Sequence, residues 1–261
     1  MSDAPILSTV QDAVGILTIN RPKTLNALDL PTLAQFEQVF SALEDDPAVR
    51  VIVITGAGDK AFIAGGDIAD LNSRQGLAHY QEFAEEIHRV FRRVELCDKP
   101  TLAAVNGFAL GGGTELLLCC DLRLLADSCE LGLPEINLGI FPGAGGTQRI
   151  IREIAPCKAR EMMFTGDRIT AAQAVDIGLA NAVVPAAELR ERALELAARI
   201  ARKSPLTLKL LKRTLQHGAD MPLPAALQYE QATVSLALDS ADAHEGLGAF
   251  LDKRRAEFRG E

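Results

Sequence analysis

The sequence predicts an α/β fold with a helical region at its carboxyl end. Three observations carry this prediction. Short apolar runs alternate with amphipathic stretches in the first two-thirds of the chain. Loops of small residues follow several of these runs, and helical patterns alone remain towards the end. We therefore expect a core over residues 1–195 that holds the functional site, and a helical region over residues 196–261 that packs against the core and against other copies of the chain.

The amino-terminal third predicts a hairpin, a helix, a strand and a second helix. Residues 6–19 alternate in hydrophobicity around a short turn, as in a hairpin. Asp29 is a suitable N-cap and Pro31 stands just inside the helix that follows. Residues 49–55 predict a buried strand, and residues 76–97 an amphipathic helix with a basic, solvated face. The expected apolar positions of the first helix are Leu33, Phe36, Phe40 and Leu43.

Further along, residues 101–105 predict a buried strand that leads into Gly111–Gly113 and a helix. Three short strands are expected at 122–126, 130–133 and 182–184. The remaining segments predict helices, at 158–164, 170–178, 187–201, 205–215, 223–238 and 243–258.

Composition excludes several classes of protein. Hydrophobic residues make up 48% of the chain, which is ordinary for a soluble globular protein. A net charge of −8 argues against a general nucleic-acid binder, which is normally basic. The apolar stretch 102–120 contains Glu115, which is too costly for a membrane span. The five cysteines lack metal or redox spacing and the start lacks signal-peptide character, so we expect a cytoplasmic protein with reduced thiols and no metal.

The stretch from Val105 to Asp121 organises the chain. Its three glycines cost conformational entropy, and such a cost is typical of places where the backbone approaches something closely. A helix start also presents unpaired N–H groups that favour negative charge. Glu115 beside these donors predicts a catalytic acid. The stretch alone is equally consistent with glycines that permit tight packing and a Glu115 that caps the helix.

Two further loops resemble this one in composition. They are Ala64–Asp67 and Gly143–Gly146, and a second acid, Glu135, precedes the latter. The sequence has no Walker loop, no strict dinucleotide fingerprint and no nucleophile elbow. The three loops and two acids are therefore the candidate site.

The motifs around these loops resemble the crotonase family. They are Phe62-x-Ala-Gly-Gly-Asp67, Asn106-Gly-Phe-Ala-Leu-Gly-Gly-Gly-Thr-Glu115 and Pro134-Glu-x-x-Leu-Gly-x-x-Pro-Gly-Ala-Gly-Gly-Thr-Gln-Arg149. The likeness extends from Asn20 to Lys253. It implies stacked ββα units that form two roughly perpendicular sheets, with a carboxyl-terminal helical trimerisation region. Within the family the chain most resembles enoyl-CoA hydratases, because both acids are present.

The resemblance also implies roles for these residues. The N–H groups of Ala64 and Gly112 would form an oxyanion hole for the thioester carbonyl. Glu115 would activate the water that attacks the β-carbon, and Glu135 would deliver a proton to the α-carbon. The implied product is a 3-hydroxyacyl-CoA, formed without a metal or redox cofactor. The implied assembly is a trimer or a hexamer built from two trimers.

The coenzyme A contacts are likewise implied by resemblance. Phe250 and Lys253 would reach the nucleotide from the same or a neighbouring subunit, although Lys23 and Lys253 are also consistent with ordinary surface lysines. Many hydratases have a lysine shortly after the loop aspartate, whereas this chain has Ala69 and Asp70. The other implied contacts are Lys23, Leu25, Ala27, Ala64, Gly65, Gly66, Asp67, Ile68, Gly112, Pro134 and Gly143.

Other functions fit the same pattern. A crotonase-type isomerase, or a hydratase for branched or dicarboxylic enoyl-CoA, would share these motifs. Residues 66–80 and 138–142 are expected to shape the acyl pocket. An RNA-binding or acyl-CoA-binding protein is a third hypothesis, because Lys209, Lys212 and Arg213 form a local basic run. The acidic balance of the whole chain counts against nucleic acid as a partner.

Overall fold

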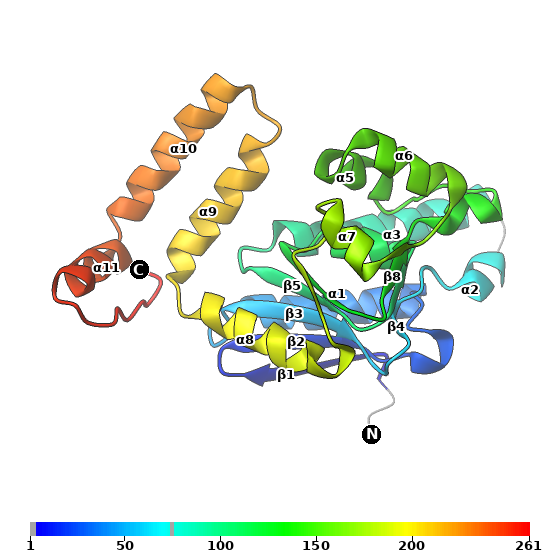
Figure 1. Cartoon of the computed structure of the whole chain (residues 1–261), viewed down its shortest axis with the longest axis horizontal. Helices are drawn as coiled ribbons and strands as arrows, with labels where there is room; N and C mark the ends of the chain where they lie inside the picture. Colours follow the sequence, from blue (N-terminus) through cyan, green and yellow to red (C-terminus); the bar gives the residue numbers. More distant parts are fainter. Residues whose placement is uncertain (1–3, 74–75) are drawn as a thin grey trace.

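Two β-sheets with flanking helices form the body of the protein, and a helical arm extends from it (Figure 1). The computed structural model describes residues 4–73 and 76–261. The strands are β1 (Ile6–Gln11), β2 (Val14–Ile19), β3 (Val51–Gly56), β4 (Ala61–Ile63), β5 (Thr101–Val105), β6 (Phe108–Leu110), β7 (Leu122–Ala126), β8 (Glu130–Gly132), β9 (Ile169–Thr170) and β10 (Ala182–Val184).

The larger sheet has the strand order β1-β2-β3-β5-β7-β10. β1 and β2 form the predicted antiparallel hairpin, and its turn places Asp12 and Ala13 at positive φ, as a two-residue hairpin turn requires. The other neighbours are parallel. β5 is buried along its whole length, as is typical of a strand covered on both faces.

The smaller sheet has the order β4-β6-β8-β9. Successive strands alternate between the sheets: β3, β5 and β7 belong to the larger sheet, and β4, β6 and β8 follow them into the smaller one. This repeated step is the stacked ββα arrangement expected from the resemblance. The sequence analysis missed β4 and β6, because three-residue strands beside glycines have too few residues to show alternation.

The body contains eight α-helices and three short 3₁₀ helices within the described ranges. Most of the predicted helices are confirmed to within a few residues, including the Asp29 cap, which accepts the N–H of Thr32 at 2.8 Å. The α-helices are α1 (Leu30–Asp45), α2 (Ile68–Ser73), α3 (Leu77–Leu96), α4 (Gly112–Leu117), α5 (Gly146–Glu153), α6 (Pro156–Thr165), α7 (Ala171–Asp176) and α8 (Leu189–Ala201); the 3₁₀ helices are η1 (Pro22–Thr24), η2 (Pro134–Leu138) and η3 (Ala186–Glu188).

The arm consists of α9 (Pro205–Gly218), α10 (Leu223–Leu238) and α11 (Ala241–Leu251). α9 and α10 pack side by side, and α11 lies at the far end (Figure 1). The predicted boundary at residue 196 falls inside α8, which packs on the larger sheet. The predicted helix 243–258 is too long. The chain turns back after α11 because the Asp242 carboxylate accepts the N–H groups of Arg259 and Gly260.

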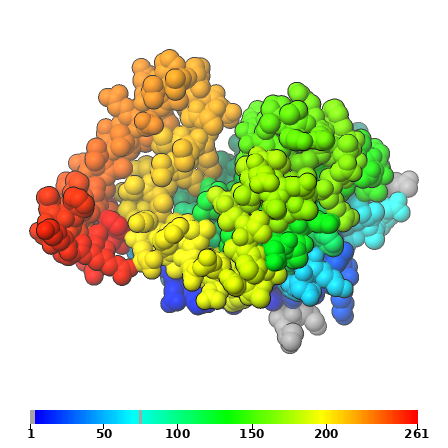
Figure 2. All heavy atoms as spheres, in the orientation of Figure 1, coloured from blue at the N-terminus to red at the C-terminus, as the bar shows by residue number. Residues whose placement is uncertain are grey.

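A hollow separates the arm from the body (Figure 2). It contains a cavity of about 400 Å³ whose lining includes Glu95 of α3, Cys120 from the segment after α4, Glu153 of α5 and Gln216 of α9. The three candidate loops lie outside this lining.

Candidate active site

Glu115 lies in the first turn of α4 and is almost fully buried, with 3% of its surface exposed. Its Oε1 atom accepts the N–H of Ala144 at 2.7 Å and the N–H of Gly146 at 2.8 Å. The second oxygen has no hydrogen-bond partner among the described residues. The carboxylate is therefore fixed through one oxygen, and the other is left for a ligand.

The three glycines before Glu115 differ in their backbone conformation and in what surrounds them. Gly111 has a φ of 52°, and a Cβ there would also lie 2.9 Å from Oε1 of Glu135. A Cβ on Gly113 would overlap the carbonyl oxygen of Ile63 in β4. At Gly112 a Cβ would meet its nearest neighbour at 3.7 Å. Gly113 therefore permits tight packing, as one of the two interpretations from the sequence expects, whereas a Cβ on Gly112 would make only ordinary contacts with Gly65 and Gly66.

Glu135 lies in η2, beside Gly111. Burial, together with the negative charge of Glu115, raises the pKa of its carboxyl to about 7. Its Oε2 atom is buried without a hydrogen-bond partner in the described part of the chain. A carboxyl in this setting holds its proton at neutral pH far more readily than an exposed one.

Burial also raises the pKa of Glu115. The N–H groups of Gly146 and Ala144 and the charge of Arg149 oppose this shift, because each stabilises the ionised form. Glu115 has charge-stabilising partners, whereas the charged groups near Glu135 only raise its pKa. This asymmetry suits two carboxyls with opposite proton-transfer roles.

One predicted donor is misassigned. The N–H of Ala64 donates to the carbonyl oxygen of Leu25 at 3.1 Å, so it is occupied within the fold. Two residues later, the N–H of Gly66 has no acceptor among the residues described, and neither does that of Gly112. A Cβ built on Gly112 would lie 3.8 Å from Gly66 N, so the two groups border the same space. Gly66 and Gly112 therefore offer two neighbouring N–H donors that have no acceptor in the described part of the chain.

A family profile described as enoyl-CoA hydratase/isomerase matches residues 9–261. The chain belongs to this family. A crotonyl-CoA hydratase from Syntrophomonas wolfei is 42% identical over 253 residues, which cover 97% of each chain. A 2,3-dehydroadipyl-CoA hydratase from Escherichia coli is 40% identical over 250 residues, 96% of each chain. The crystal structure of an enoyl-CoA hydratase from Bacillus anthracis has 37% sequence identity and a TM-score of 0.96, and it covers 99% of this chain and 100% of its own. The predicted crotonase fold is thus confirmed.

A cluster of polar side chains that the sequence analysis did not single out supports the loop that carries Gly66. Arg21 contacts the carbonyl of Ala27 and pairs with Asp29 at 2.8 Å and Asp67 at 3.1 Å. The buried side chain of Asn26 accepts the N–H of Arg21 and donates to two carbonyls. The signal was present, because both residues stand in the segment from Asn20 to Leu28 that resembles the family.

This cluster gives the predicted coenzyme A residue Asp67 a structural task. One carboxylate oxygen pairs with Arg21, and the other accepts the N–H groups of Ala69 and Asp70 at the start of α2. Ile68 follows and is exposed. Lys23 and Leu25 line a cavity of about 260 Å³ together with Lys60 and Ala61.

The remaining predicted contacts divide between the site and the arm. Pro134 starts the 3₁₀ helix that carries Glu135, and Gly143 immediately precedes Ala144. Phe250 is 82% exposed in α11, and Lys253 follows this helix. Figure 1 places α11 at the opposite end of the molecule from α2, so these two residues do not join the site of their own chain.

The basic run of the arm is neutralised. Lys209 and Arg213 pair with Asp98 at 2.8 and 2.7 Å, and Lys212 pairs with Asp121 at 2.7 Å. These bridges join α9 to the body. No cluster of three metal-ligating side chains occurs within residues 4–73 and 76–261, and no helix there is long and apolar enough to cross a membrane.

Proposed function

We propose that this protein hydrates trans-2-enoyl-CoA thioesters to 3-hydroxyacyl-CoA. The observation that carries the proposal is the placement of two unlike carboxyls beside two free backbone donors. Glu115 is held by Ala144 and Gly146 with one oxygen open, while Glu135 has a raised pKa and an unpaired oxygen. The similarity to the hydratases from Syntrophomonas wolfei and Escherichia coli supports the same reaction class.

In this mechanism the thioester carbonyl accepts hydrogen bonds from the N–H groups of Gly66 and Gly112. The ionised Glu115 takes a proton from water as the water oxygen bonds to the β-carbon. Negative charge then develops on the carbonyl oxygen, where the two donors stabilise it. Glu135 transfers its proton to the α-carbon, and the thioester carbonyl re-forms. Glu115 gains one proton and Glu135 loses one, and exchange with solvent restores both.

The reaction as proposed needs no resident metal or redox cofactor, because only protons and water are exchanged. Coenzyme A belongs to the substrate. We assign its nucleotide to the surface near Lys23 and Leu25, and its pantetheine to the path along Gly65, Gly66 and Ile68. The exposed apolar side chain of Ile136 follows Glu135 directly in sequence, and it suits an acyl chain.

The proposed assembly is a trimer or a dimer of trimers. The arm exposes many large apolar side chains, a surface that monomeric proteins rarely leave in water. In such an assembly, Phe250 and Lys253 would serve the site of a neighbouring subunit. The exposed set on the arm includes Leu215, Leu223, Leu236, Leu238, Phe250 and Leu251.

Hydration of crotonyl-CoA by purified protein tests the proposal. Loss of the conjugated thioester absorbance, with 3-hydroxybutyryl-CoA as product, is the expected result. Conversion of a 3-enoyl-CoA without hydration would assign an isomerase instead. Binding of acyl-CoA without turnover of either substrate would reduce the chain to a binding protein. A panel of short, long, branched and dicarboxylic enoyl-CoA then fixes the acyl preference.

A further inference from the structure

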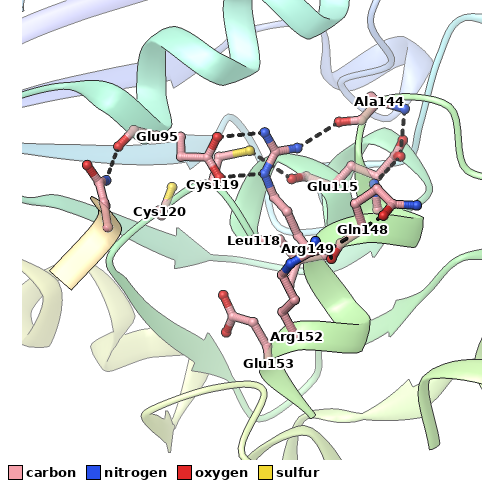
Figure 3. Close-up of polar contacts among 12 residues, drawn as sticks. Glu95, Glu115, Leu118, Cys119, Cys120, Ala144, Gln148, Arg149, Arg152 and Glu153 are labelled. Carbon is pink, nitrogen blue, oxygen red and sulfur yellow. Dashed lines mark hydrogen bonds and ion pairs between the residues drawn. The ribbon is translucent and has the colours of Figure 1, made fainter. Parts of the chain in front are cut away.

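An ion pair lies directly behind the loop that holds Glu115. Arg149, in the first turn of α5, forms two hydrogen bonds to the Glu95 carboxylate near the end of α3, both of 2.8 Å (Figure 3). Its Nη1 atom donates to the carbonyl oxygen of Ala144 at 3.1 Å. Ala144 is the residue whose N–H binds Glu115. The loop residue is therefore held between the catalytic acid and the guanidinium.

Arg149 also acts on Glu115 through charge. The side chain is 17% exposed, so water screens it little. The groups around Glu115 are Arg149 from α5, Glu135 from η2 and the thiol of Cys119 from the turn that follows α4. Burial raises the pKa of the Cys119 thiol and so keeps it protonated. When Glu135 ionises, its negative charge repels that of Glu115. Arg149 is thus the cation that favours the ionised form of Glu115.

A second buried arginine shows what a purely structural pair looks like. Arg123 pairs with Glu153 and donates to carbonyl oxygens at the end of α4, such as that of Leu117 at 2.7 Å. Within the described part of the chain, none of its hydrogen-bond partners lies on the loop at Ala144. The Arg149 pair differs because its third contact lies on that loop.

We propose that Arg149 is a positioning residue for Glu115, and that Glu95 fixes it in place. This inference rests on the proposed function. Arg149 acts through Ala144, which sets the direction of the carboxylate, and through its charge. Glu95 is itself held from the arm, because the Gln216 side chain of α9 donates to its backbone carbonyl oxygen.

Three variants test the proposal. Arg149→Met removes both the charge and the contact to Ala144. It should lower kcat on crotonyl-CoA about 10–100-fold, with KM within about threefold, because a small misplacement of a catalytic group costs rate more than binding. The acid limb of the kcat profile should move to higher pH, since Glu115 loses its cation. Arg149→Lys keeps the charge, so it should restore the acid limb and part of kcat. Arg152→Met, one turn further along α5, is the matched control and should behave as wild type, because among the described residues Arg152 donates hydrogen bonds only to Gln148.

The inference about Arg149 and the proposed function can be refuted independently of each other. If wild-type protein hydrates no enoyl-CoA, the proposed function is wrong, and infrared titration of the Glu115 carboxyl, assigned with Glu115→Gln, still tests the inference without substrate. Equal losses in Arg149→Met and Arg149→Lys with unmoved acid limbs would overturn it, as would a wild-type profile in Arg149→Met. If Arg149→Met does not fold, Glu95→Gln is tested instead. In Glu95→Gln, kcat should fall, and the acid limb of the kcat profile should not move to higher pH. A kcat equal to that of wild type would contradict the role of Glu95.

Discussion

The N–H of Ala64 donates a hydrogen bond of 3.1 Å to the carbonyl oxygen of Leu25. This bond joins the first candidate loop to the segment held by Arg21 and Asn26. It removes Ala64 from the set of available donors and leaves Gly66 to pair with Gly112. A backbone donor cannot be tested by side-chain removal, so the relevant experiments alter the N–H itself or observe the group that it polarises.

Gly66→Pro should abolish most of the carbonyl polarisation, because proline has no N–H. Gly66→Ala retains the N–H, and its Cβ would meet Leu71 and Phe83 at 3.4 Å, an ordinary contact. The measurement is the absorbance shift and C=O stretching frequency of a bound enoyl-CoA with a chromophoric acyl group. Wild type and Gly66→Ala should show a red shift and a lowered frequency. An unshifted carbonyl in wild type would contradict the Gly66 and Gly112 assignment.

Glu115→Gln and Glu135→Gln should each lower kcat by about 10²–10⁴-fold with little change in KM. Glutamine keeps the shape of each side chain but neither accepts nor delivers a proton at neutral pH. Steady-state kinetics on crotonyl-CoA provide the measurement, with circular dichroism as the check on folding. Near wild-type kcat in either variant would remove that residue from the mechanism.

The hydration rate should fall as the pH rises through about 7. The reason is that Glu135 must carry its proton to deliver it, and burial raises its pKa to about 7. On the acid side the rate should fall as Glu115 gains a proton and can no longer activate water. A profile of kcat/KM against pH measures both limbs. The pH profile of the residual activity of Glu135→Gln should lack the alkaline limb. An alkaline limb that persists in this variant would belong to another group.

Glu135→Gln should raise the apparent Tm in mildly alkaline buffer and leave it almost unchanged near pH 4. The pKa of Glu135 is about 7 in the fold against an ordinary value of 4.5. A raised pKa gives stability that is complete below the ordinary value and is lost as the pH rises through the folded value. The buried carboxylate therefore destabilises the protein at high pH. Equal Tm differences at both pH values would contradict this account.

Light scattering at micromolar concentration should report a trimer or a hexamer. The driving force is burial of the apolar surface of the arm, at about 25 cal/mol per Å². Introducing Asp at both Leu236 and Leu238, which are exposed on α10, should shift the protein towards smaller species. A monomeric wild-type protein would refute the proposed assembly. It would also refute the proposal that Phe250 and Lys253 contribute to the site of a neighbouring subunit.

The sequence by itself located most of the elements and the two candidate acids. Periodic apolar positions in α1 and the Asp29 cap are local signals, so spacing alone locates them. The glycine loops and both acids were found in the same way, because their residue types are unusual where they stand. The sequence did not predict the three-residue strands, because so few residues show no clear alternation. It also did not predict the true end of α11, because that end depends on hydrogen bonds from residues 259 and 260 to Asp242.

Only the tertiary structure decided which donors are free and which charges meet. Ala64 and Gly66 are equivalent in a linear motif, and the bond from Ala64 to Leu25 distinguishes them because it joins residues 39 positions apart in the fold. Likewise, Arg149 and Glu95 are separated by 54 positions in the sequence, and the fold places their side chains within hydrogen-bonding distance. The raised pKa of Glu135 is also a tertiary property, because desolvation depends on everything that surrounds a carboxyl and not on its neighbours in sequence.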